Sequence, residues 1–132
     1  MEEQQLTGEI IGCAMTMHSA LGPGFVESVH RNALGHELGK AGIQFECLKP
    51  ILVSYDGVIV GKFEADMVVE GKVLLELKAV QTLVAAHEAQ LVNYLTATGI
   101  DIGLLINFGA SSLQFRRKTR LFPKPPDPGI TL

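Results

Sequence analysis

The first forty residues repeat apolar side chains at the spacing of an α-helix. The first apolar stripe runs through Leu6, Ile10, Ala14, Met17 and Leu21. It predicts a helix from about residue 7 to residue 21, which the glycine- and proline-rich segment 21–24 ends. A second helix is predicted over residues 25–40. Its core-facing residues are expected to be Val26, Val29, Ala33 and Leu38.

Beyond residue 42 the pattern changes to the two-residue alternation of β-strands. Asp56-Gly57 predicts a tight hairpin turn, and the strand before it is expected to bend or bulge near Pro50. A further helix is predicted over residues 83–98, closed by Gly99. The predicted strands span residues 43–55, 58–69, 72–80, 101–108 and 113–121. The order is ααβββαβ(β), an α/β fold with a mixed sheet flanked by helices and an edge strand last.

Composition indicates one domain in a reducing compartment. The 132 residues are 47% hydrophobic and 19% charged, so we expect a single domain over residues 1–122 and a proline-rich flexible tail over residues 123–132. Two cysteines are too few for a disulfide scaffold or a zinc site. No membrane span and no secretory signal is recognisable. We therefore expect a cytoplasmic protein, and the high apolar content also allows a homo-oligomer.

The stretch 63–80 predicts a hairpin with two unlike faces. Its odd positions are all apolar: Phe63, Ala65, Met67, Val69, Val73, Leu75, Leu77 and Ala79. The apolar faces of the two strands coincide only if the two residue numbers of each cross-strand pair add up to an even number. This requires a turn with an odd number of residues, such as 69–71 with its glycine in the left-handed conformation. That register places Asp66, Glu76 and Lys78 on one surface, whereas a two-residue turn would separate the two acids.

Asp66 and Glu76 are candidate ligands of a divalent cation. Two neighbouring carboxylates repel each other, and a cation relieves this repulsion. Mg²⁺ prefers hard oxygen ligands, which Asp66, Glu76 and the backbone carbonyl of Leu77 can supply. Lys78 could then hold the attacking water or offset charge on a phosphate in metal-assisted hydrolysis. Spacing alone leaves open an ordinary surface strand with a Glu–Lys pair.

The helix predicted over residues 83–98 carries a polar stripe beside its core stripe. The polar stripe contains His87, Gln90 and Tyr94. Such side chains favour a helix edge that faces a site, because a solvated edge more often carries Lys and Glu. The alternatives are a capped or solvated His87 and an ordinary pair between Gln90 and Tyr94.

The charge is distributed unevenly along the chain, although the net charge is only −3. Residues 1–115 carry 6 basic and 13 acidic side chains, and residues 116–132 carry 5 basic and 1 acidic. A basic end on an acidic body is compatible with phosphate contacts by Arg116, Arg117 and Lys118. A solvated polar terminus is the alternative.

Several of these motifs occur together in a known group of proteins. Asp66, then Glu76-Leu77-Lys78 after a glycine turn, then Gln90-x-x-x-Tyr94 on a helix resembles the PD-(D/E)XK nuclease superfamily, in particular its RecB-type branch. The segment 24–30, Gly-Phe-Val-Glu-Ser-Val-His, is similar to the signature of the GxxExxY family. The likeness covers about residues 6–120. It implies a restriction-endonuclease-like αβββαβ core.

The resemblance also implies a chemistry. It implies a Mg²⁺ or Mn²⁺ site at Asp66 and Glu76, a catalytic Lys78, and a nucleic-acid substrate, DNA in preference to RNA. Glu27 would approach this metal or a second one, whereas an i,i+4 pair with Arg31 is its alternative role. A module that keeps the fold but not the catalysis is the competing function.

The same resemblance assigns the remaining residues. Gln90 and Tyr94 would steady the site or contact the substrate. His30 stands where the family has tyrosine, and we place it near the metal or the substrate, with a surface histidine as the alternative. Ala65 stands where the superfamily name has proline.

Overall fold

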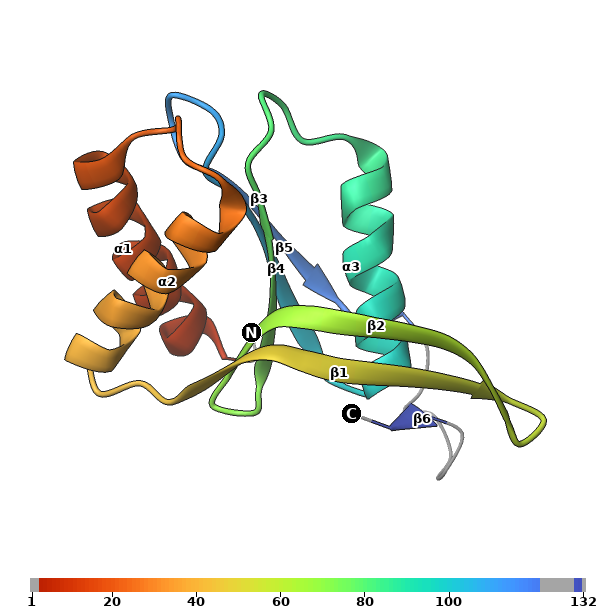
Figure 1. Cartoon of the computed structure of the whole chain (residues 1–132). Coiled ribbons are helices and arrows are strands. Elements are labelled where there is room, and N and C mark those ends of the chain that lie inside the picture. The colour runs from red at the N-terminus through yellow and green to blue at the C-terminus, as the bar shows by residue number, and fades with distance from the viewer. Residues whose placement is uncertain (1–2, 122–129, 132) are drawn as a thin grey trace.

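The computed structural model describes residues 3–121 and 130–131 and forms a mixed sheet between helices (Figure 1). The helices are α1 (Gln4–Leu21), α2 (Glu27–Lys40) and α3 (Ala85–Thr98). The strands are β1 (Phe45–Tyr55), β2 (Val58–Val69), β3 (Val73–Lys78), β4 (Ile102–Asn107), β5 (Gln114–Thr119) and β6 (Ile130–Thr131). The predicted α/β class and the predicted order of its elements are confirmed.

The described strands form one sheet in the order β5-β4-β3-β2-β1-β6. The β3–β4 pair is parallel and the other pairs are antiparallel. Helices α1 and α2 cover one face of the sheet, and α3 covers the other (Figure 1). Every residue of β4 is buried, as its continuous apolar sequence predicts for a strand covered on both faces.

Two apolar clusters fill the space between the sheet and its helices. The cluster under α1 and α2 includes Ile10, Ala14, Leu34, Leu38, Leu75 and Leu104. The cluster under α3 includes Leu74, Leu91, Leu95 and Leu105. No helix among residues 3–121 is both long enough and apolar enough to cross a membrane.

Helix α2 buries only part of the predicted stripe, because Leu38 is buried as predicted and Val26 is not. His30, Leu34 and Leu38 are buried, whereas Val26 is 67% exposed. Val26 has extended backbone angles and precedes the first helical residue, Glu27. Because the helix begins two residues later than predicted, the stripe at i, i+4 and i+8 starts from His30 and not from Val26.

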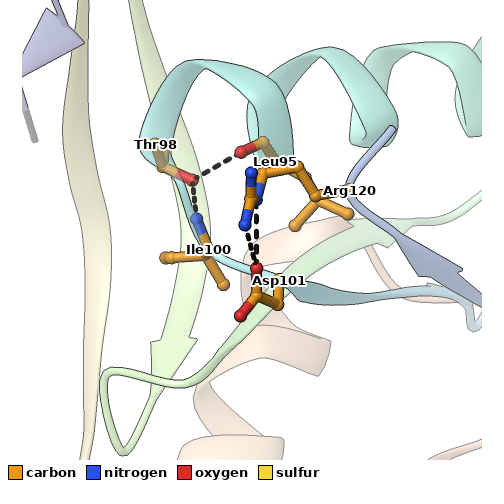
Figure 2. A network of polar contacts seen from close by, with 5 residues as sticks. All are labelled: Leu95, Thr98, Ile100, Asp101 and Arg120. Carbon is orange, nitrogen blue, oxygen red and sulfur yellow. Dashed lines mark hydrogen bonds and ion pairs between the residues drawn. The ribbon is translucent and has the colours of Figure 1, made fainter. Parts of the chain in front are cut away.

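The end of α3 is held to the start of β4 and the end of β5 (Figure 2). The hydroxyl of Thr98 donates to the carbonyl of Leu95 at 3.4 Å and accepts from the N–H of Ile100 at 3.2 Å. The Arg120 side chain donates to the Asp101 carboxylate with its Nε at 3.0 Å. These contacts close the connection between α3 and β4.

The β1–β2 hairpin has the predicted turn and two irregularities. Both residues of Asp56-Gly57 have positive φ, 53° and 78°, the geometry of the preferred two-residue hairpin turn. The irregularity predicted near Pro50 lies two residues earlier, at Leu48 with φ 53°. The register also shifts between Val53 and Ser54.

The turn from β2 to β3 has the predicted odd length. Val69 pairs with Val73, so the turn consists of Glu70, Gly71 and Lys72. Gly71 has φ 65°, in the left-handed region as predicted. The numbers of paired residues therefore sum to an even number.

The predicted continuous apolar face of β2 is wrong, because the strand changes sides at Asp66. Met67 belongs to the cluster under α1 and α2, whereas Ala65 belongs to the cluster under α3. Opposite Asp66, Leu48 is left-handed and the β1–β2 ladder omits this pair. The hairpin therefore turns at this point, and β2 leaves β3 to run crosswise to the axis of α3 (Figure 1).

The predicted tail, residues 123–132, contains one described element. Ile130–Thr131 form β6, which pairs with β1 at Leu52 and Val53. Backbone hydrogen bonds to the sheet therefore hold this part of the predicted tail. Residues 122–129 and 132 lie outside the described residues.

Candidate metal centre

Asp66 and Glu76 lie where β2 and β3 separate. The two strands pair over only three residues each, and Met67 with Leu75 is the last pair. Beyond this pair, the hydrogen bonds between the two strands join a backbone N–H to a side chain. The N–H of Leu77 donates to Oδ2 of Asp66 at 2.7 Å, and the N–H of Asp66 donates to Oε1 of Glu76 at 3.4 Å. The two carboxylates are thus held side by side, as the predicted register requires. They lie in the fork, the place beyond the Met67–Leu75 pair where β2 and β3 separate.

The pKa values of both acids are raised, which favours their protonated forms. Glu76 is only 4% exposed, and burial, followed by repulsion from Asp66, raises its pKa to about 8. Burial also raises the pKa of Asp66, although the Leu77 N–H and the Lys78 charge act in the opposite direction. A dianion is therefore unfavourable here without a cation. The hard oxygen donors fit Mg²⁺ or Mn²⁺.

The backbone of Leu77 adds a third oxygen on the same side. In a strand, the N–H and C=O of one residue point toward the same neighbouring strand. Since the Leu77 N–H points to Asp66, its carbonyl faces the gap that β2 has left. The predicted set of Asp66, Glu76 and the Leu77 carbonyl is therefore geometrically coherent.

Lys78 connects the fork to α3. Its Nζ donates to Oε1 of Gln90 at 3.4 Å, and Nε2 of Gln90 donates to the hydroxyl of Tyr94 at 3.3 Å. Burial and the nearby carboxylates of Glu76 and Asp66 raise the pKa of Tyr94. Gln90 and Tyr94 are thus an i,i+4 pair that also borders the site.

His87 does not join this stripe. Its Nδ1 accepts from the N–H of Val84 at 3.1 Å, so the ring caps the first turn of α3. Of the alternatives for His87, the structure shows the one in which it caps the helix. Such a cap is needed because the N–H groups of a first helical turn have no partners within the helix.

Two residues of α2 reach the other side of the fork. Glu27 is half-buried, and burial and the Asp66 carboxylate raise its pKa, whereas Lys78 and Arg31 lower it. The Arg31 charge also lowers the pKa of Asp66. Within residues 3–121, no three His, Cys, Asp or Glu side chains form a group that could hold an ion. Glu27 therefore borders the Asp66–Glu76 pair without completing a three-carboxylate cluster.

The assignment of His30 to the substrate or to the surface is wrong. His30 is 0% exposed, and its Nε2 lies 3.0 Å from the carbonyl of Gly22. Its ring stacks on Phe108 with centroids 4.8 Å apart and planes 7° apart. Because His30 lies on the stripe with Leu34 and Leu38, it packs α2 onto the sheet and does not face solvent.

The basic residues of β5 do not form one surface, because side chains alternate along a strand. Lys118 makes an ion pair with Glu88 on α3, whereas Arg117 donates to the hydroxyl of Thr7 on α1 at 3.1 Å. Arg117 therefore does not lie on the same surface as Lys118, so the three basic residues proposed for phosphate contacts do not act as one patch. Arg116 is exposed on the α3 side. By register it lies two strands, or roughly 10 Å, from Glu76.

Sequence reasoning missed two residues that shape the site. Arg31 was treated only as a pairing partner of Glu27, although its charge also acts on Asp66. Asn107 is fully buried and hydrogen-bonded to Val80, just beyond Lys78. A lone amide at the end of an apolar strand is the signal that could have identified Asn107.

Comparisons with known proteins agree with this fold. The crystal structure of SSO0001 is similar with a TM-score of 0.57 at 15% sequence identity, over 91% of this chain and 61% of that one. This likeness shows the fold, and the chain spans about three fifths of that structure's length. No curated protein matches the chain. A family model described as the PD-(D/E)XK nuclease superfamily matches residues 4–118. Because this match runs from α1 into β5, the chain belongs to the PD-(D/E)XK nuclease superfamily.

Proposed function

We propose that this protein is a divalent-metal-dependent nuclease that hydrolyses phosphodiester bonds, in DNA in preference to RNA. The observation that carries the proposal is the contact between Asp66 and Glu76 at the end of the β2–β3 ladder, with Lys78 following on the same face of β3. Superfamily membership supports metal-dependent nuclease chemistry.

Asp66, Glu76 and the Leu77 carbonyl would hold Mg²⁺ or Mn²⁺, with Glu27 at the border of the site. Bound there, the ion would supply Lewis-acid stabilisation of the phosphate and lower the pKa of water. The raised pKa of Glu76 supports this assignment, because the buried Glu76 and the half-buried Asp66 need a positive charge to ionise together.

Lys78 would orient the attacking water and stabilise negative charge that develops on the phosphate. Gln90 would position its ammonium group, and Tyr94 would in turn position Gln90. Arg116 and Lys118 would contact the phosphate backbone on the α3 side. Such contacts make affinity fall with salt concentration.

A cleavage assay tests the proposal. We expect purified protein to cleave single-stranded DNA, duplex DNA or RNA with Mg²⁺ or Mn²⁺ and not with chelator. Lys78→Ala should reduce the rate at least about 100-fold. Lys72→Ala is the matched control, because Lys72 lies exposed in the β2–β3 turn. Cleavage that survives both Lys78→Ala and chelator would contradict the proposal.

A module that binds nucleic acid or assembles with a partner, without catalysis, is the second candidate. It is favoured by the lack of a third side-chain ligand beside Asp66 and Glu76 among residues 3–121. Calorimetry separates the two candidates. No heat of binding with Mg²⁺ or Mn²⁺ at millimolar concentration would favour the module. Binding that Glu76→Gln abolishes would favour the nuclease.

A further inference from the structure

A groove opens between the β1–β2 hairpin and α3, next to the fork. Its volume is about 610 Å³. On the helix side, Ala86, Ala89 and Ala97 line it, and on the hairpin side Val53 and Phe63 do. Because alanine side chains are short, α3 leaves this space beside the hairpin unfilled.

The groove presents an aromatic ring to solvent. Phe63 is 45% exposed, although its ring lies 5.5 Å from that of Tyr94, centroid to centroid. None of the described lining residues is charged, and Gln90, Asn93 and Thr96 add amide and hydroxyl groups. A ligand that matches this lining is flat, uncharged and able to form hydrogen bonds at its edge. Nucleobases have these properties and stack on exposed aromatic rings.

The groove borders the proposed catalytic centre at Gln90. Gln90 lines the groove and also accepts a hydrogen bond from Nζ of Lys78. A nucleotide whose phosphate lies at Lys78 therefore has the groove within reach of its base.

We propose that this groove binds an unpaired nucleobase of the substrate, stacked on Phe63. The inference rests on the proposed nuclease function and makes the substrate a single strand. A base inside a duplex has its faces covered by its neighbours and cannot enter such a groove without leaving the stack.

The test compares three DNA ligands with Ca²⁺ in place of Mg²⁺: a fluorescein-labelled single strand, the same strand in a duplex, and an abasic strand of equal length. Fluorescence anisotropy gives the affinities. We expect Phe63→Leu to weaken binding of the base-bearing strand about tenfold and to leave the abasic strand unaffected. Phe63→Tyr should restore binding. Val60→Ala is the matched control, because Val60 is 60% exposed on the same hairpin and does not line the groove.

The groove proposal would be overturned if Phe63→Leu weakened binding of the base-bearing and the abasic strand equally, or if it weakened neither. It would also be overturned if the duplex bound more tightly than the single strand. Cleavage of the same ligands with Mg²⁺ separates this result from a failure of the proposed function. If wild-type protein cleaves and Phe63→Leu changes nothing, the groove proposal fails and the nuclease stands. If stacking-dependent binding occurs without cleavage, the nuclease fails and the groove stands.

Discussion

The side chain of Asn107 makes with Val80 the two backbone hydrogen bonds that a neighbouring strand would otherwise make. Its Nδ2 donates to the Val80 carbonyl at 2.8 Å, and the Val80 N–H donates to its Oδ1 at 3.0 Å. Oδ1 also accepts from the N–H of Gly109 at 3.0 Å. The N–H of Phe108 donates to the carbonyl of Lys78 at 2.8 Å. The chain just beyond Lys78 is thus fastened to the end of β4.

Replacing Asn107 should destabilise the protein. Asn107→Ala leaves the N–H and carbonyl of Val80 without this partner, and we expect a loss of about 2 kcal/mol in the free energy of unfolding. Urea unfolding measures the loss. Asn107→Asp puts a buried carboxylate against the Val80 carbonyl and the Gln114 amide oxygen, so near neutral pH it should be at least as destabilising as Asn107→Ala. A change below about 0.5 kcal/mol in Asn107→Ala would show that water replaces the side chain.

Gly109 should tolerate no side chain. A Cβ there would lie 2.4 Å from both the N and the O of Val80, which are backbone atoms that cannot move aside. We expect Gly109→Ala to cost about 3 kcal/mol or to prevent folding. The matched control is Gly12→Ala in α1, where nothing lies within 4 Å, and it should stabilise by about 0.5–1 kcal/mol. Thermal unfolding of both variants measures the contrast, and equal effects would contradict the prediction.

The metal-free protein should lose stability as the pH rises toward 8. The pKa of Glu76 is about 8 when folded, against an ordinary value of 4.5. The folded state therefore binds its proton more tightly than the unfolded chain, and the stability this contributes is full below pH 4.5 and is lost as the pH rises through 8. Glu76→Gln should flatten this profile. At pH 8 in chelator the free energy of unfolding of Glu76→Gln should exceed that of wild type by on the order of 4 kcal/mol. A wild-type profile that rises over this range would contradict the prediction.

Divalent cations should raise the melting temperature of the wild-type protein. Mg²⁺ or Mn²⁺ at 100 times the dissociation constant stabilises by about 2.7 kcal/mol. Asp66→Asn and Glu76→Gln should remove most of this effect, because each removes a charged ligand. Glu64→Gln is the control, since Glu64 is an exposed acid of the same strand. A shift of equal size in all four proteins would show that the ion binds elsewhere.

The sequence by itself determined the register of β2 and β3. The apolar positions on the two strands can share a face only if an odd number of residues separates them, and Gly71 supplies the left-handed conformation that such a turn requires. It follows without coordinates that Asp66 lies across from Glu76. The order of the elements followed in the same way from the change between helical and strand periodicity.

Tertiary structure decided where this regularity ends. The change of side at Asp66 depends on the left-handed Leu48 in the partner strand, and no pattern within β2 reports the backbone of β1. His30 likewise has the polarity of a surface residue, and its burial depends on tertiary contacts, the stacking on Phe108 and the contact with the Gly22 carbonyl. A periodic sequence specifies which side chains share a face as long as the backbone stays regular. Contacts between segments that are distant in the sequence decide where the backbone becomes irregular.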